Sequence, residues 1–140
     1  MRADAPPERA VVRIQLHAGA LFTSDEAIPT LLLLGSLRAG PVSFEVGLAT
    51  FFIRTDVAAG LRVFPLSSHG RALSIGVRAT RPLVEVREVN DPTVMVSAGY
   101  EHAFGRRGLF SVELGSWWIL ENQSPDQALI LLLGFGRQID

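Results

Sequence analysis

Neighbouring carboxylates and the histidines are the side chains of this sequence that could do acid–base or metal chemistry. Glu101 and Glu113 are expected to fall opposite each other on consecutive segments, and two adjacent carboxyl groups can act as a general acid and a general base. The three histidines are His17, His69 and His102. A zinc site needs ligands that converge on one point, whereas these three lie at different depths and on different faces of the expected structure. We therefore predict no metal ion and no cofactor.

Eight segments, each about 10 to 13 residues long, must position these side chains. A tilted strand needs about 9 to 11 residues to cross a bilayer, more than the usual globular strand has. Linkers rich in Gly, Pro, Asn, Asp and Ser separate the segments, and no helical period persists, so the content is all-β. The predicted strands are Val11–Phe22, Pro29–Arg38, Val42–Ile53, Val57–Leu66, Ala72–Val84, Thr93–Phe104, Leu109–Leu120 and Ala128–Arg137.

Apolar and more polar residues alternate along six of these segments, as strands with two different faces require. In the fifth segment, for example, Ile75 and Val77 share one face and Gly76 the other. The second and eighth segments are apolar on both faces around Leu31–Leu34 and Leu129–Leu133, so the pattern does not assign their faces.

The less apolar face carries many glycines, which indicates that it points into a narrow barrel. Glycine weakens a water-exposed strand surface, whereas the lumen of an eight-stranded barrel has room for small residues beside a few long ones. The glycines are Gly19, Gly47, Gly60, Gly76, Gly99 and Gly115.

Charges of both signs share this face, and buried charges must be paired. We therefore predict a lumenal ion-pair network of Arg13, Glu45, Arg62, Arg78, Glu101 and Glu113. Glu45 and Arg62 are expected to pair directly from neighbouring strands. The adjacent Glu101 and Glu113 are expected to be neutralised by Arg78 or Arg13.

Aromatic residues on the apolar face sort by height, as the two interfacial girdles of a membrane barrel do. Counting from the turns, Phe44, Phe104 and Phe110 lie near one end, and Phe22, Phe52 and Trp118 lie near the other. Phe51, Phe64 and Trp117 are expected to point inward and to help fill the lumen. An open pore is therefore not expected.

The composition agrees with a membrane barrel and excludes several other classes of protein. The sequence is 48% hydrophobic and 19% charged, which is apolar for a small soluble domain. A net charge of −1 argues against a nucleic-acid partner, and the absence of Cys excludes disulfides and thiolate chemistry. The longest uncharged stretches, such as Ala27 to Leu37, are too short for a membrane-spanning helix.

Two strand–turn–strand patterns resemble those of a known group. Gly60–Pro65 followed by Leu73–Val77 is one, and Ser97–His102 leading through Gly105–Gly108 to Val112–Gly115 is the other. The chain resembles, in pattern and over nearly its whole length, the small eight-stranded outer-membrane proteins of Gram-negative bacteria, the OmpA/OmpX-like and opacity-type barrels. The resemblance implies an antiparallel up-and-down transmembrane β-barrel in the outer membrane, monomeric, with the lipid bilayer as its partner.

The resemblance also implies that both termini and the short turns are periplasmic, while the opposite loops face outward. Such barrels usually end in an aromatic residue, whereas this sequence ends Gly136–Asp140, with Phe135 the last aromatic. Residues 1–10 lack the apolar core of a signal peptide, so we expect a disordered or periplasmic extension there and the barrel over 11–140.

Some relatives in that group are enzymes that modify lipid A with Ser and His at the lipid face. In this sequence, His102 with a neighbouring Ser is the one pair that could correspond to such a site. Ser97 and Ser111, however, are expected to face the lumen, and the site would lie at the wrong end of the barrel. A closed lumen would also deny a substrate access to the carboxylates. We therefore predict a structural, non-enzymatic barrel with no catalytic residue, and rank a lipid-modifying enzyme third.

The second alternative is a soluble, lipocalin-like barrel that binds an apolar ligand. It makes the opposite prediction about the two faces. Arg78 and Glu113 would then meet water, and a cavity would be lined by Leu16, Val46, Leu61, Ile75, Val96 and Leu114.

Overall fold

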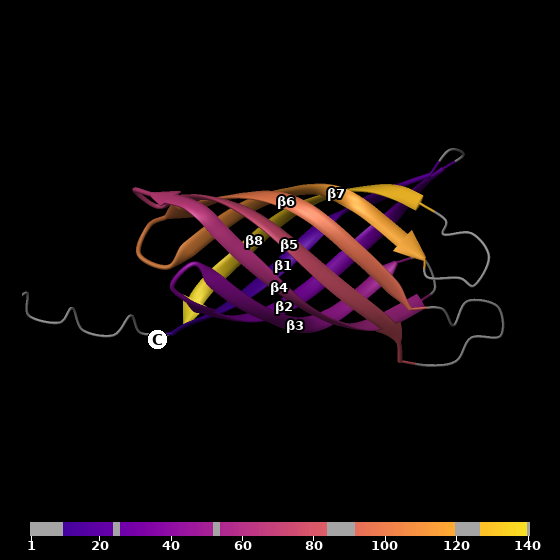
Figure 1. Cartoon of the computed structure of the whole chain (residues 1–140), viewed down its shortest axis with the longest axis horizontal. Helices are drawn as coiled ribbons and strands as arrows, with labels where there is room; N and C mark the ends of the chain where they lie inside the picture. Colours follow the sequence, from indigo (N-terminus) through magenta and orange to yellow (C-terminus); the bar gives the residue numbers. More distant parts are fainter. Residues whose placement is uncertain (1–9, 24–25, 52–53, 84–91, 120–126, 140) are drawn as a thin grey trace, which may run out of the picture.

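The chain folds into one closed barrel of eight antiparallel strands, each hydrogen-bonded to its neighbours in the sequence, with β1 and β8 closing the barrel (Figure 1). The computed structural model describes residues 10–23, 26–51, 54–83, 92–119 and 127–139. The strands are β1 Val11–Phe22, β2 Ala27–Ala39, β3 Val42–Phe51, β4 Arg54–Ser68, β5 Arg71–Pro82, β6 Thr93–Phe104, β7 Gly108–Ile119 and β8 Gln127–Ile139. The fold class predicted from the sequence is confirmed.

The predicted strands match the observed ones and differ at their ends. β4 extends the expected Val57–Leu66 by three residues toward the preceding hairpin and two toward the next, and β8 extends to Ile139. The backbone pairing between strands continues beyond the apolar residues, so the hydrophobic pattern alone underestimates the length of these strands. The predicted ends at Ile53, Val84 and Leu120 lie outside the described residues.

Three short turns, β2–β3, β4–β5 and β6–β7, set the register at the end of the barrel where the C-terminus lies (Figure 1). Between β4 and β5 the turn residues His69 and Gly70 have φ of 52° and 77°, the left-handed backbone of a two-residue hairpin turn. Between β6 and β7 the pairing closes at Phe104 and Gly108, with Gly105 at φ 61°. We call this end of the barrel the turn end.

A β-bulge interrupts the β4–β5 ladder at Phe64 and Pro65, which lie opposite Ser74 alone. Proline has no N–H to donate to a ladder, so a bulge is one of the few places in a sheet that accepts it. The Phe64 N–H instead donates to the Pro41 carbonyl at 2.7 Å. Phe64, which is 4% exposed, continues the inward alternation of Asp56, Ala58 and Arg62, whereas Leu66 beyond the bulge faces outward and is 63% exposed.

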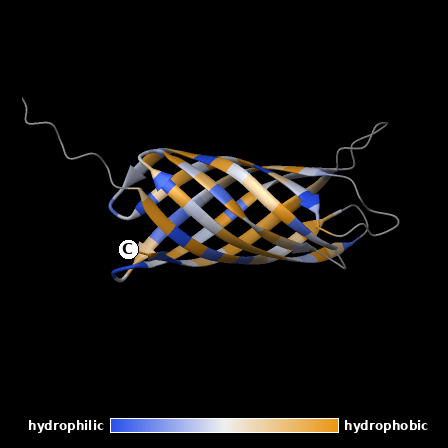
Figure 2. Cartoon of the chain, turned by 90° about the horizontal axis from the view of Figure 1, so that it is seen from below, coloured by the Kyte–Doolittle hydropathy of each residue, from blue (hydrophilic) through white to orange (hydrophobic). Residues whose placement is uncertain are grey.

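Hydrophobic and hydrophilic residues alternate along the strands (Figure 2), and the exposed fractions show that the alternating apolar residues lie on the outer face. Leu16 is 52% exposed and Ile75 is 58% exposed, whereas Arg78 is 1% and Glu113 is 4% exposed. The soluble lipocalin alternative is therefore wrong. The residues it would place around a cavity are all on the outside: Leu16, Val46, Leu61, Ile75, Val96 and Leu114.

The inside of the barrel contains an apolar layer that the sequence pattern did not assign. Leu32 and Leu34 of β2 and Ile130 and Leu132 of β8 are buried, while the leucines between them face outward. The inward cluster comprises Leu21, Leu32, Leu34, Ala49, Ala58, Met95, Trp117, Ala128, Ile130 and Leu132. The part of the chain that the structure describes contains no helix long and apolar enough to span a membrane.

Candidate functional site

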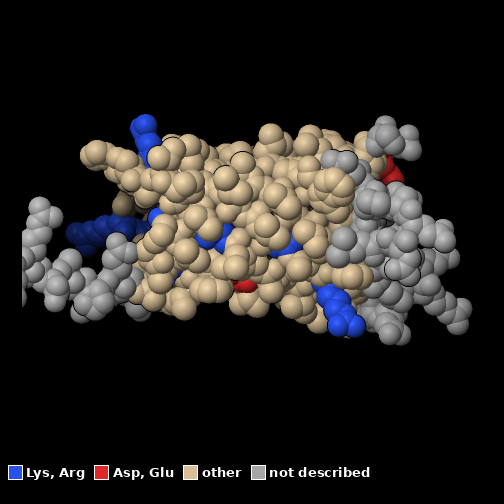
Figure 3. All heavy atoms as spheres, in the orientation of Figure 1, with Lys and Arg blue, Asp and Glu red and all other residues tan. Residues whose placement is uncertain are grey.

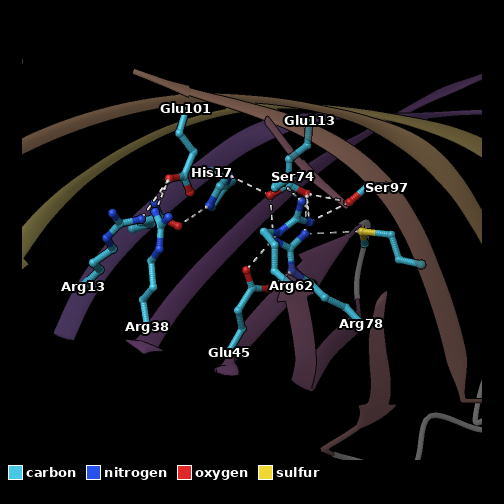
Figure 4. Close-up of polar contacts among 12 residues, drawn as sticks. Arg13, His17, Arg38, Glu45, Arg62, Ser74, Arg78, Ser97, Glu101 and Glu113 are labelled. Atoms are coloured by element: carbon cyan, nitrogen blue, oxygen red, sulfur yellow. Dashed lines mark hydrogen bonds and ion pairs between the residues drawn. The ribbon is translucent and has the colours of Figure 1, made fainter. Parts of the chain in front are cut away.

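Four charged side chains meet in the middle of the lumen and form a closed ring of alternating charge (Figure 4). Arg62 Nε donates to Glu45 Oε1 at 3.1 Å, and Arg78 Nε donates to Glu45 Oε2 at 2.6 Å. Arg62 Nη2 donates to Glu113 Oε2 at 3.1 Å, and Arg78 donates to both Glu113 oxygens at 2.5 and 2.6 Å. Each carboxylate thus bridges both guanidinium groups, and the ring has no net charge.

The ring joins opposite walls of the barrel. Glu45 lies on β3 and Glu113 on β7, four strands apart in a barrel of eight, while Arg62 and Arg78 lie on β4 and β5. The register places Glu45 beside Gly60 and Arg62 beside Ser43, so this ion pair is diagonal rather than directly opposite. The Arg62 side chain is long enough to reach Glu45 across this offset of two residues along the ladder.

Glycine and serine residues provide the space and the remaining hydrogen bonds for Arg62. A Cβ at Gly76 would lie 2.7 Å from the Arg62 guanidinium carbon, so the guanidinium lies against the bare backbone. Arg62 also donates to Ser74 Oγ at 2.8 Å and to Ser97 Oγ at 2.7 Å. With all three guanidinium nitrogens hydrogen-bonded and two carboxylates as partners, the buried arginine avoids the large penalty of an unpaired charge.

A second cluster lies nearer the turn end, at the mouth of the lumen (Figure 4). Arg13 Nη1 donates to Glu101 Oε2 at 2.9 Å, and Arg38 Nη1 approaches the same oxygen at 4.0 Å. The Arg38 guanidinium carbon lies 3.9 Å from the centre of the Phe64 ring, within cation–π range. Arg38 and Phe64 thus complete a cluster that the six predicted residues describe only in part.

The predicted opposition of Glu101 and Glu113 is wrong. Glu101 pairs with Ser111, and Glu113 pairs with Gly99, two residues away along the ladder. The three-residue turn after Phe104 sets this register. The two carboxylates therefore belong to different clusters, Glu101 with Arg13 and Glu113 with Arg62 and Arg78.

Toward the opposite end of the lumen, the buried polar side chains that the structure describes include two threonines and an aspartate. Thr80 Oγ1 donates to Asp56 Oδ2 at 2.7 Å, and Thr80 also hydrogen-bonds Thr93. Asp56 and Thr93 are both fully buried. The sequence analysis did not single out these residues. They could have been found from the sequence, because each lies an even number of residues from other inward-facing residues of its strand.

The predicted girdle aromatics lie on the outer face wherever the structure describes their side chains. Phe22, Phe44 and Phe104 are exposed, and Phe110 and Trp118 are half-buried. Phe52 lies outside the described residues, and so does the side chain of the predicted lumen-filling Phe51. The sequence analysis missed Phe135, which is exposed and packs on Phe110 with ring centres 5.3 Å apart.

The candidate catalytic groups do not come together at the outer surface. Ser97 and Ser111 are buried in the lumen, whereas His102 is half-buried on the outward face of β6. His17 lies inside, with Nε2 3.3 Å from Gln15 Oε1 and Nδ1 3.9 Å from Glu113 Oε1. Among the described residues, no group of three His, Asp or Glu side chains is arranged to hold a metal ion.

Solved structures of natural and designed β-barrels match the fold of this chain. Neisserial surface protein A matches with a TM-score of 0.67 at 11% identity, over 93% of this chain and 97% of that one. The N-terminal β-barrel domain of Pseudomonas aeruginosa OprF matches with a TM-score of 0.61 at 13% identity, over 94% and 100%.

A de novo designed transmembrane β-barrel matches with a TM-score of 0.65 at 14% identity, over 98% of this chain and 100% of the design. No family model and no curated protein matches the sequence. At these identities the likeness concerns the fold. The chain has the fold of the small eight-stranded outer-membrane β-barrels, as the resemblance in its sequence implied.

Proposed function

We propose that this protein is a structural, non-enzymatic barrel of the bacterial outer membrane, monomeric and with a sealed lumen. The observation that carries the proposal is the distribution of polarity across the barrel wall. Aliphatic side chains form the outward face, and the charged ring of Glu45, Arg62, Arg78 and Glu113 is buried at the centre. A water-soluble barrel would reverse this arrangement.

Several layers of inward side chains support a sealed lumen. The Arg13–Glu101 cluster and Phe64 lie at the turn end, and the neutral ring lies behind them. The apolar layer that includes Leu132 and Trp117 adds a further barrier, since it offers an ion no polar partner. Eight strands enclose a space that side chains can fill, whereas aqueous channels need many more.

The pairing and the orientation of the buried polar side chains support a non-enzymatic role. Both buried glutamates of the ring are neutralised by two arginines each, so neither is presented to a substrate. The serines that a lipid-modifying site would need, Ser97 and Ser111, point away from lipid. On the face drawn in Figure 3, only small patches of charged atoms are visible over the middle of the barrel, and arginines project near its two ends.

The outer membrane is the location that fits this surface, because closed β-barrels with an apolar outer band occur there. Neisserial surface protein A and OprF, which share the fold, support it. We place the turn end, with its short hairpins, in the periplasm. The opposite end of the barrel, where β1 ends at Phe22 and β5 ends at Pro82, then faces the cell exterior.

Refolding in detergent tests membrane residence. The protein should refold from urea into micelles or vesicles as a monomer, and the folded form should migrate faster on a gel unless it is heated. A folded, monodisperse β protein in detergent-free buffer would contradict the proposal.

Conductance across a planar bilayer tests the seal separately. The wild-type barrel should show no steady ion current after insertion. The Leu132→Ser/Trp117→Ser variant, which opens the apolar layer, should conduct more. A steady current through the wild-type barrel would disprove the sealed lumen without disproving membrane residence.

A further inference from the structure

We propose that the outer surface of the barrel at the turn end carries a binding site for the phosphate headgroup of an anionic phospholipid, built on Arg71, His69 and His102. The inference rests on the proposed membrane residence. The site is a groove of about 470 Å³ between the β4–β5 turn and β6. Its lining includes Leu66, Ser68, His69, Arg71, Leu73, Tyr100 and His102.

Two rungs of the sheet, separated by the rung of Ala72 and Glu101, place this groove at the level of the lipid headgroups. The inner rung runs across Leu66, Leu73 and Tyr100, all outward-facing and exposed. The second rung, nearer the turn end, runs across Ser68, Arg71 and His102. The outward-facing side chains therefore change from mainly apolar to polar or basic over two residues along the strand. A membrane–water interface requires this change.

Arg71 and His102 are directly paired across β5 and β6, so their side chains project from one spot on the surface. Arg71 has a permanent positive charge and planar donors suited to phosphate oxygens. The Nδ1 atom of His102 is buried and has no hydrogen-bond partner among the described residues.

His69 is held beside them in a backbone conformation that costs energy. Its φ of 52° lies in the left-handed region, which glycine or asparagine adopts more readily. The Ser68 hydroxyl lies 2.6 Å from His69 Nδ1 and orients the ring, which leaves Nε2 for a ligand. The Gly70 carbonyl accepts from the Ala103 N–H at 2.7 Å, so the turn is tied to β6.

The charge around the groove favours an anion. Arg106, Arg107 and Arg137 are exposed at the same end, and of the described residues there, no acidic side chain is exposed, since Glu101 points inward. A free phosphate ion would use only the basic rung. The apolar rung at Leu66 and Leu73 provides a surface for an acyl chain, so the groove fits a phospholipid better than the inorganic ion.

Native mass spectrometry of the refolded barrel in detergent tests the site. Wild type should retain dioleoyl phosphatidylglycerol more strongly than dioleoyl phosphatidylcholine, which has the same chains and no net charge. In the Arg71→Gln variant, the ratio of retained phosphatidylglycerol to retained phosphatidylcholine should fall about fivefold. This is the factor expected for one arginine at an anionic membrane surface. Arg81→Gln is the matched control, because Arg81 is an exposed arginine on the same strand at the opposite end.

Three results would overturn the proposal: equal retention of the two lipids, an equal loss in the Arg71 and Arg81 variants, or full displacement of phosphatidylglycerol by inorganic phosphate at matched ionic strength. The last would indicate a free-anion site. Each of these outcomes requires a folded barrel, which the heat-dependent gel shift verifies. Failure to refold in detergent would instead contradict the proposed function.

Discussion

The guanidinium of Arg78 and the carboxylate of Glu113 form a two-pronged ion pair inside the barrel, with Nη1–Oε2 and Nη2–Oε1 distances of 2.5 and 2.6 Å. The two residues come from β5 and β7, which are not neighbours in the sheet. The pair therefore crosses the lumen and ties together strands that share no backbone hydrogen bond. Its cost of desolvation is offset only while every charge in the ring keeps its partners.

Replacing Glu113 with Gln should destabilise the barrel by about 3 to 5 kcal/mol, because Arg62 and Arg78 would each lose a charged partner in a dry interior. Urea unfolding in phosphatidylcholine vesicles, followed by tryptophan fluorescence, measures the change. Glu26→Gln is the control, since Glu26 is exposed, and it should change the free energy of unfolding by less than about 0.5 kcal/mol. Similar losses in the two variants would contradict a buried ring.

The two ion-pair clusters should differ in strength. A double-mutant cycle on Glu45→Ala and Arg62→Ala should give a coupling free energy of about 2 kcal/mol, because both side chains are nearly inaccessible. The same cycle on Arg13→Ala and Glu101→Ala should give less than about 1 kcal/mol, since that pair lies nearer water at the mouth of the lumen. A larger coupling at the mouth than in the ring would reverse the burial order that the structure shows.

Gly47 should be intolerant of a side chain, whereas Gly35 should accept one. A Cβ on Gly47 would collide with the backbone of Leu33 on β2, but a Cβ on Gly35 would meet only the Val46 carbonyl, at 3.8 Å. We expect Gly47→Ala to cost about 1 to 3 kcal/mol, as overpacking does, and Gly35→Ala to be nearly neutral. The check is the midpoint of urea unfolding for both variants, and equal midpoints would disprove the close approach of β2 and β3.

An outward charge should cost more at mid-strand than near the turn end. Val77 is 47% exposed near the middle of β5, and Leu66 is 63% exposed beside the β4–β5 turn. Val77→Arg should destabilise the barrel in phosphatidylcholine vesicles by about 2 to 4 kcal/mol, and Leu66→Arg by less than about 1 kcal/mol. If both changes are harmless in vesicles, the aliphatic face is not in contact with lipid.

Local patterns in the sequence were sufficient for the strands, the order of the meander and the direction of each alternating face. Side chains of a strand point to alternate sides, so Ile75 and Gly76 had to lie on opposite faces once a strand was assigned. The glycines and paired charges on one face then indicated which side was the lumen, because a small barrel excludes most large residues.

Segments whose hydropathy does not alternate gave no information about which side chains face the lumen. β2 and β8 are leucine-rich on both faces, so the sequence did not reveal that Leu32 and Leu132 build an apolar layer inside the barrel. Only closure of the sheet decides which leucines are enclosed, because both faces of an isolated strand look the same in composition.

The sequence by itself determined that this chain forms an eight-stranded β-barrel with an apolar outer face, since strand length, period-two hydropathy and turn residues all act through near neighbours in the chain. Tertiary structure alone decided which charges meet. The three-residue turn at Gly105 separates Glu101 from Glu113, and the barrel brings Glu45 on β3 to Glu113 on β7 through two arginines. Such pairings depend on turn geometry and on the closure of the sheet, which are properties of the whole fold.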